Sequence, residues 1–177
     1  RCVCAARRAV ERRHPARIGG SVSGFRRGVR LGIDVGKARV GVARCDPDGM
    51  LAVPVETVTR DERTVQRIAE LATEHDAFEV LVGLPISLGG NDTSSTADAR
   101  DVAAEIATAT RLPVRLVDER LSTVSAHAAL RSSGRSQRSS RKLVDQVAAV
   151  VLLQQAIDVE KSTGNPPGAL TDPPERP

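Results

Sequence analysis

The stretch LGIDVGKARVGVA, residues 31–43, decides the fold because it contains two short apolar runs joined through Gly36 and Lys37. This pattern predicts two adjacent strands of a hairpin. Side chains alternate between the faces of a strand, so Asp34 shares its face with Gly32 and Gly36 while the apolar residues share the other face. Glycines beside an acid leave room for another group to approach the backbone closely. The alternative is a strand-edge aspartate that pairs with a nearby arginine.

The rest of the chain extends this hairpin into an α/β pattern. We expect strands at 30–35, 40–44, 52–58, 80–84 and 114–117, and helices at 62–75, 96–110, 122–130 and about 140–161. Three consecutive strands followed by strands that alternate with helices predict a mixed sheet. The expected sheet has five strands, of which the first three are antiparallel and the last two parallel, and helices flank it.

The length and the charge distribution predict one domain with two tails. A chain of 177 residues is long enough for one core and too short for two. We expect the domain at 30–161, between a disordered basic tail at 1–29 and a disordered Pro-rich tail at 162–177. The first tail holds eight Arg against one Glu, whereas the remaining residues hold 18 cations and 21 acids, a net charge of −3. That tail is also compatible with a transit peptide, a nucleic-acid-contacting arm or residues upstream of the native start.

The cysteine and aromatic residues indicate the redox compartment of the protein and the kinds of contact that it can make. Cys2, Cys4 and Cys45 lack the spacing of a metal site or a disulfide framework, so a reducing, cytoplasmic setting is expected. No run approaches the roughly 20 apolar residues of a membrane-spanning helix, and no membrane partner is expected. Phe25 and Phe78 are the only aromatic residues, so the core must be aliphatic and nucleic-acid contacts must do without base stacking.

Further acids stand where carboxylates are costly. An apolar strand ends in Asp118 and Glu119, and the carboxyl ends of parallel strands border the crevice in which α/β proteins bind ligands. Helix capping or an ion pair with Arg120 is the alternative for these two. Asp145 precedes an apolar helical run and is expected to face inward. A helix-dipole position stabilises an acid by only about 0.3–1 kcal/mol, so a buried Asp145 needs a cation.

These acids predict a divalent-metal site if the first strand, the fifth strand and the last helix meet at one point. Three adjacent carboxylates repel one another, and an all-oxygen cluster suits Mg²⁺ or Mn²⁺. Divalent ions that bridge phosphate oxygens are the basis of two-metal phosphodiester hydrolysis. The three acids are therefore consistent with a hydrolase that acts on phosphodiester bonds.

Four segments in order resemble the motifs of the YqgF/RuvX-type family: GIDVGKARVGVA at 32–43, VGLPISLGG at 82–90, DERLST at 118–123 and KLVDQVAAVVLLQ at 142–154. The resemblance implies an RNase H-like fold. It also implies the activity of a Holliday junction resolvase, or of a nuclease that matures the 5′ end of pre-16S rRNA in ribosome biogenesis. Asp34, Glu119 and Asp145 would then be the catalytic metal ligands, and Asp118 would have a supporting role.

Basic residues accompany these acids. The segment LRSSGRSQRSSRK, residues 130–142, has five cations and no acid, and we expect a loop that contacts phosphates independently of base sequence. A merely solvated charge run is the alternative. The predicted nucleic-acid-binding residues are Lys37, Arg39, Arg120, Arg131, Arg135, Arg138, Arg141 and Lys142. Lys142 is the best single candidate for orienting the scissile phosphate.

Two other functions stay open at this point. A non-catalytic nucleic-acid-binding factor would use the basic segment without needing the acids. An actin-like ATPase also has an acid followed by a hairpin, but it needs a second lobe to enclose its nucleotide. The choice between pre-rRNA and branched DNA, and between monomer and homodimer, is open as well, because junction resolution requires two sites on a symmetric dimer.

Overall fold

The computed structural model describes residues 24–87, 91–118 and 137–171, with the side chains of the last segment described from residue 146. Within this part of the chain, six strands form one sheet: β1 (Val29–Val35), β2 (Arg39–Cys45), β3 (Ala52–Thr59), β4 (Ala77–Leu84), β5 (Val114–Asp118) and β6 (Ala169–Leu170). Their order across the sheet is β3-β2-β1-β4-β5-β6. The pairs β1–β4 and β4–β5 are parallel, and the other three pairs are antiparallel.

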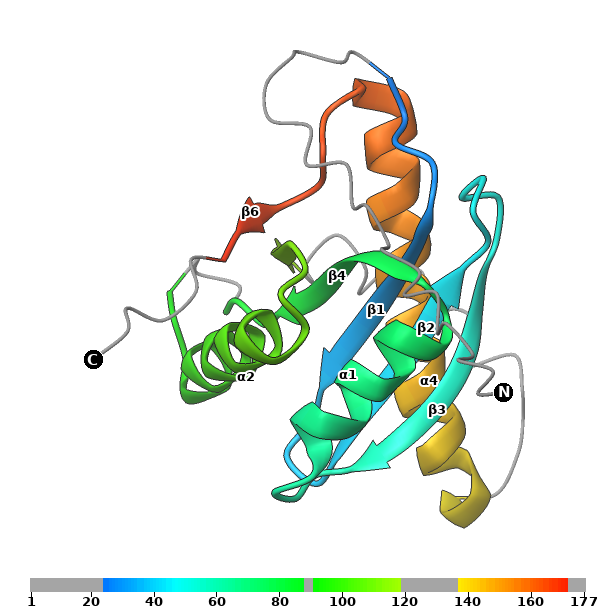
Figure 1. The fold of residues 1–177 in the computed structure, drawn as a ribbon. Coiled ribbons are helices and arrows are strands. Elements are labelled where there is room, and N and C mark those ends of the chain that lie inside the picture. Colours follow the sequence, from blue (N-terminus) through cyan, green and yellow to red (C-terminus); the bar gives the residue numbers. More distant parts are fainter. Residues whose placement is uncertain (1–23, 88–90, 119–136, 172–177) are drawn as a thin grey trace, which may run out of the picture.

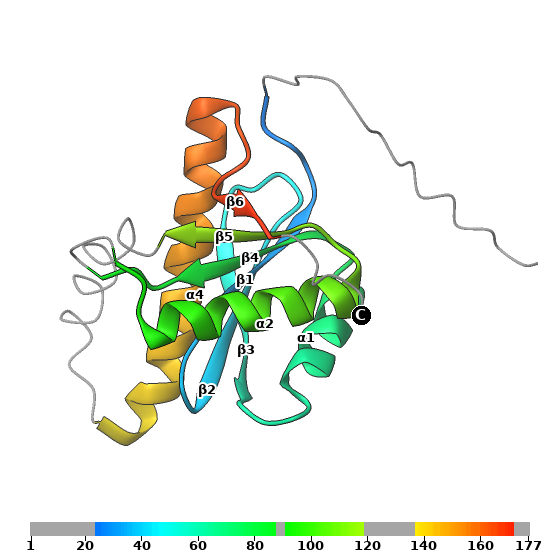
Figure 2. The ribbon, with the colours of Figure 1, turned by 90° about the vertical axis from the view of Figure 1, so that its left-hand side faces the viewer.

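Helices cover both faces of this sheet. The helices α1 (Thr64–Glu74) and α2 (Ser94–Thr110) lie on one face and α4 (Gln137–Thr163) lies on the other (Figures 1 and 2). Aliphatic side chains such as Leu31 and Ile33 fill the layer against α1 and α2, and a second aliphatic cluster that includes Leu81 and Leu153 fills the layer against α4. The mixed sheet with flanking helices and the aliphatic core are therefore confirmed.

Local sequence explains how α1 and α2 form. Ile68, Leu71 and Ala72 recur at helical spacing and are buried, so α1 packs its apolar stripe on the sheet. A capping box in which Thr93 and Thr96 bond each other's backbone N–H groups begins α2. These are the start and packing signals expected of amphipathic helices on one side of a sheet.

Two details of the expected fold were wrong. The sheet has a sixth strand, because Ala169–Leu170 pairs with β5 inside the segment predicted to be a disordered tail. A two-residue strand has no periodicity that a sequence pattern can reveal. The helix expected from about 140 begins at Gln137, so the end of the expected 130–142 loop is helical. Arg, Gln and Lys are good helix formers, so they continue a helix without any apolar repeat. The helix expected at 122–130 lies outside the described residues.

A buried ion-pair network closes the end of the sheet at which β1 begins. Glu79 accepts hydrogen bonds from Arg26 at 2.8 and 2.9 Å, from Arg115 at 2.8 Å and from Arg30 at 3.2 Å. Glu160, near the end of α4, accepts from Arg30 at 2.9 Å and from Arg26 at 2.8 Å. The side chains of Arg30 and Glu79 are both 0% exposed, so each buried charge depends on its partners.

Both aromatic residues of the chain flank this network. The guanidinium carbon of Arg30 lies 4.8 Å from the ring centre of Phe25 and 4.6 Å from that of Phe78, so cation–π attraction adds to the ion pairs. Phe25 and Arg26 belong to the predicted basic tail, yet they contact the domain. The division at residues 30 and 161 otherwise stays a prediction. No helix among the described residues has the length and apolar character that spanning a bilayer requires.

Candidate functional site

Asp34 is half-buried near the carboxyl end of β1 and lies on the sheet face that α4 covers. The expected alternation is confirmed: Leu31 and Ile33 pack toward α1 and α2, whereas Gly32 contacts α4. A Cβ atom added at Gly32 would lie 2.7 Å from Leu153 Cβ and 3.0 Å from the carbonyl oxygen of Ala149. The close approach that the glycines predicted is therefore made, at Gly32, by α4.

The direction of α4 brings its first half toward Asp34. The start of β1 meets the end of α4, where Arg30 pairs with Glu160, and Gly32 contacts Ala149 further back along the helix. The helix therefore runs opposite to β1. Figure 1 shows the same arrangement, with the beginning of α4 (yellow) at the end of the sheet to which the arrowhead of β1 points.

Glycines surround Asp34 on its face of the sheet. Gly32 and Gly36 lie two residues before and after it along the chain, and Gly41 in β2 is its partner in the antiparallel pair. On the other side, Gly83 follows the β4 residue that pairs with Ile33, and alternation puts it on the same face. On this face of the sheet, the positions next to the Asp34 carboxylate are thus all glycines.

Asp118 ends β5 on the opposite face. Val117 packs in the α4-side cluster and Val114 in the cluster against α1 and α2, so strand alternation turns Asp118 away from the face of Asp34. Glu119 lies outside the described residues, and Asp145 lies in α4 with its side chain undescribed. Among the described side chains, no three His, Cys, Asp or Glu residues are arranged to hold a metal ion. The three-acid site therefore stays a prediction.

The predicted nucleic-acid-binding residues fall into three groups. Lys37 is exposed in the turn between β1 and β2, and Arg39 is half-buried as the first residue of β2. Arg138, Arg141 and Lys142 lie in the first part of α4, and their side chains are undescribed. The remaining three, Arg120, Arg131 and Arg135, lie outside the described residues.

A residue that the sequence analysis missed braces the turn after Asp34. The Arg60 guanidinium donates to the carbonyl oxygen of Gly36 at 3.2 Å, and the Arg60 backbone N–H donates to that of Ala38 at 3.0 Å. Both of its terminal nitrogens also donate to the carboxylate of Asp98 in α2. These hydrogen bonds raise the pKa of Arg60 and lower that of Asp98. No local pattern signals the pair, because its members are 38 residues apart.

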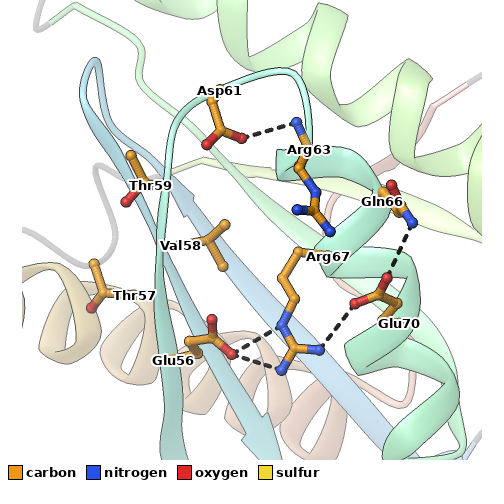
Figure 3. Close-up of a pocket in the computed structure, with 9 residues that line it drawn as sticks. All are labelled: Glu56, Thr57, Val58, Thr59, Asp61, Arg63, Gln66, Arg67 and Glu70. Carbon is orange, nitrogen blue, oxygen red and sulfur yellow. Dashed lines mark hydrogen bonds and ion pairs between the residues drawn. The ribbon is translucent and has the colours of Figure 1, made fainter.

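A hollow of about 250 Å³ between β3 and α1 is a separate feature. Figure 3 shows Arg67 on its wall, held by Glu56 and Glu70. The hydrogen bonds that Arg67 donates to these carboxylates and to that of Glu74 raise its pKa. The hollow is lined by side chains of α1, which covers the sheet face opposite Asp34. It therefore forms no part of the candidate site.

Comparison with known proteins gives consistent matches. The model of the family RuvX, described as Holliday junction resolvase, matches residues 28–159. A protein of Clavibacter michiganensis subsp. michiganensis, named as a candidate pre-16S rRNA nuclease, is 57% identical over 149 residues, which cover 82% of this chain and 92% of that protein. Proteins with the same name from Leifsonia xyli subsp. xyli and Streptomyces coelicolor are 54% and 50% identical, over 84% and 81% of this chain and 97% and 88% of their own lengths.

Solved structures of RuvC from Thermus thermophilus share the fold. RuvC in complex with a Holliday junction substrate superposes with a TM-score of 0.51 at 18% sequence identity, over 76% of this chain and 96% of that chain. Another RuvC structure gives a TM-score of 0.51 at 17% identity, over 77% and 98% of the two chains. At this identity the likeness shows the fold alone, and it confirms the expected RNase H-like architecture.

Proposed function

The chain belongs to the RuvX family of Holliday junction resolvases, and from that premise we propose that it is a divalent-metal-dependent nuclease that hydrolyses phosphodiester bonds. Its proposed substrate is structured nucleic acid, either the 5′ end of pre-16S rRNA or branched DNA. The names of its relatives favour the rRNA substrate. Resolution of a four-way junction would in addition require a symmetric dimer.

The position of Asp34 carries this proposal. Asp34 lies at the carboxyl end of a strand, with glycines at the neighbouring positions of its sheet face and a covering helix beside it, which supports the proposal that it binds a cation close to a substrate phosphate. Gly41 and Gly83 add no side chain beside the carboxylate, and both of their positions are buried.

Strand alternation supports Glu119 rather than Asp118 as the second acid. Asp118 lies on the sheet face opposite Asp34, so the next residue along the chain is the one that an extended strand would turn toward α4. We therefore propose Glu119 for this role. Its neighbour Asp118 is proposed to support the end of β5.

The crossing of α4 over β1 supports Asp145 as the third acid. From Gly32 to Asp34 the strand advances about 6.6 Å. From Ala149 or Leu153, which both contact Gly32, back to Asp145 the helix covers about 6–12 Å, toward the same end of the sheet because α4 runs opposite to β1. Both acids therefore lie beyond the crossing point toward the same end of the sheet, and we propose that they share a metal site.

The donor set suits Mg²⁺ or Mn²⁺, because these hard ions prefer carboxylate oxygens. A divalent ion held by Asp34, Glu119 and Asp145 would stabilise the negative charge that develops on the phosphate during hydrolysis. Around this ion, basic side chains would neutralise neighbouring phosphates and offset the repulsion between these phosphates and the carboxylates. We propose this role for Lys37, Arg39, Arg120 and the cations of the segment 131–142. These contacts involve the nucleic-acid backbone and would orient the substrate without reading bases.

Cleavage assays with aspartate variants test the proposal. A pre-16S rRNA 5′-end fragment and a four-way DNA junction would be incubated with Mg²⁺ and wild-type protein, Asp34→Asn or Asp145→Asn. We expect each variant to lower the cleavage rate at least about 100-fold, because loss of a ligand should cost no less than loss of its supporting partners. The matched control is Asp48→Asn, which changes a half-exposed aspartate in the β2–β3 loop.

The outcomes separate the nuclease from its alternative. If Asp34→Asn and Asp145→Asn cleave as fast as wild type, the site assignment is wrong. If wild-type protein binds both substrates but cleaves neither with Mg²⁺ or Mn²⁺, the chain is a non-catalytic binding factor. Preferred cleavage of the RNA or of the junction identifies the substrate class.

A further inference from the structure

We propose that Arg60 is a positioning residue that holds the Lys37 turn in the conformation in which Lys37 contacts a substrate phosphate. This inference rests on the proposed nuclease function and adds to it a residue outside the four motif segments. The argument starts from the carbonyl groups on the two sides of Lys37.

Arg60 binds the backbone on both sides of Lys37. Its side chain donates a hydrogen bond to the carbonyl oxygen of Gly36 at 3.2 Å, and its backbone N–H donates one to the carbonyl oxygen of Ala38 at 3.0 Å. The turn is also closed by a 2.9 Å hydrogen bond from the Gly36 N–H to the Arg39 carbonyl oxygen. The Gly36–Lys37 peptide group and the Ala38–Arg39 peptide group are therefore both held by Arg60, while the Lys37 side chain itself is exposed.

Asp98 holds Arg60 in turn. The planar guanidinium places two donors on the Asp98 carboxylate, and one of these donors is shared with Gly36. A lysine ammonium is a single point of charge and cannot reproduce this fork. The side chains are only 22% and 38% exposed, so water competes weakly for these hydrogen bonds.

The helix α2, which contains Asp98, also holds the loop after β4. Asp98 lies in the first two turns of α2, and two residues earlier the hydroxyl of Thr96 donates to the carbonyl oxygen of Pro85. The beginning of α2 thus ties together the chain segments that follow β1 and β4, two parallel neighbours in the sheet. A turn held in this way loses little conformational freedom when Lys37 binds a phosphate, which improves affinity.

Amide hydrogen exchange tests the structural step without any nucleic acid. In Arg60→Ala and Arg60→Lys, the amides of residues 36–39 should exchange faster than in wild type. The matched control is Arg67→Ala, which removes another carboxylate-paired arginine next to β3 that does not touch this turn. Unchanged exchange at 36–39 in both Arg60 variants would overturn the inference, whatever the protein does to nucleic acid.

A double-mutant cycle on binding tests the functional step. Affinity for the four-way junction and for the rRNA fragment would be measured with Ca²⁺ in place of Mg²⁺, for Arg60→Ala, Arg60→Lys, Lys37→Ala and Arg60→Ala/Lys37→Ala. We expect each single variant to weaken binding about 3–10-fold and to reduce the salt slope by about 1, and the double variant to resemble Lys37→Ala.

Three results would contradict the positioning role. Additive losses in the double variant would mean that Arg60 contacts the nucleic acid by itself. Wild-type affinity in Arg60→Lys would mean that charge alone matters. Wild-type affinity in Arg60→Ala would show that the brace is unnecessary. A wild-type protein that binds neither nucleic acid would instead refute the proposed function, and the exchange experiment would still decide whether Arg60 holds the turn.

Discussion

Replacing Glu79 with Gln should destabilise the protein strongly, because this carboxylate compensates buried arginines. The native network contains three arginines, at 26, 30 and 115, and two glutamates, a formal charge of +1. The substitution raises that charge to +2 and leaves Arg30, 0% exposed, with Glu160 as its charged partner. A glutamine amide can accept at one oxygen only, so about two of the four hydrogen bonds to Glu79 are lost.

The expected cost follows from these losses. At roughly 1.5–3 kcal/mol for each hydrogen bond to a charged group, two lost bonds correspond to about 3–6 kcal/mol. Removing one member of a buried ion pair costs about 3–5 kcal/mol in other proteins, which agrees. Urea titration would measure the change in the free energy of unfolding. Circular dichroism is the appropriate probe, because the chain has no Trp or Tyr for fluorescence.

Matched variants make this prediction refutable. Asp48→Asn breaks an exposed pair with Arg27, whose side chain is 76% exposed, and should cost at most about 1 kcal/mol. A cost for Glu79→Gln within that range would refute the reasoning. If Glu79→Gln is too unstable to fold, the double variant Arg30→Met/Glu79→Gln restores the charge of +1 and puts an adaptable apolar side chain between the two rings. Failure of this variant to recover stability would show that uncompensated charge is not the cause.

Two further predictions concern α4. Gly32→Ala should lower the free energy of unfolding by about 1–3 kcal/mol because the new methyl group collides with Leu153. The control Gly24→Ala should have little effect, because no atom lies within 4 Å of the added methyl group. Equal urea midpoints for the two variants would contradict the close packing of α4 on Gly32. Burial alone raises the pKa of Glu160, but hydrogen bonds from Arg26 outweigh it and hold the pKa below its ordinary value of 4.5. The resulting stabilisation is complete above pH 4.5 and is lost as the pH falls through the lower pKa of the folded protein, so the urea midpoint should drop on acidification; an equal drop in Glu160→Gln would contradict this.

Patterns local in the chain were sufficient to predict five of the six strands in the described part of the chain. The period of two in residues 31–43 predicted which residues of β1 face each layer, and the structure confirms it for Leu31, Gly32 and Ile33. The order of strand-like and helix-like segments predicted the antiparallel pairing of the first three strands and the parallel pairing of β4 with β5, but not that β4 is the parallel neighbour of β1. Both depend on neighbours along the chain, which a sequence displays directly.

Charged residues inside apolar strands are a feature whose partners local sequence patterns cannot predict. Arg30 in VRLGIDV and Glu79 in AFEVLVGL are visible as exceptions to their strands. Their partners are not visible, because Glu79 lies 49 residues from Arg30 and Glu160 lies 130 residues from it. The pairing is decided when β1, β4 and the end of α4 come together.

The sequence by itself determined the class of sheet, the resemblance to a nuclease family and the face of β1 on which Asp34 lies. Only the tertiary structure decided that α4 crosses β1 at Gly32, that Asp118 faces away from Asp34 and that Arg60 braces the turn at Lys37. The physical reason is the separation along the chain between the residues that interact. Backbone periodicity acts over two to four residues, whereas packing and ion pairs are selected among many distant partners when the chain folds.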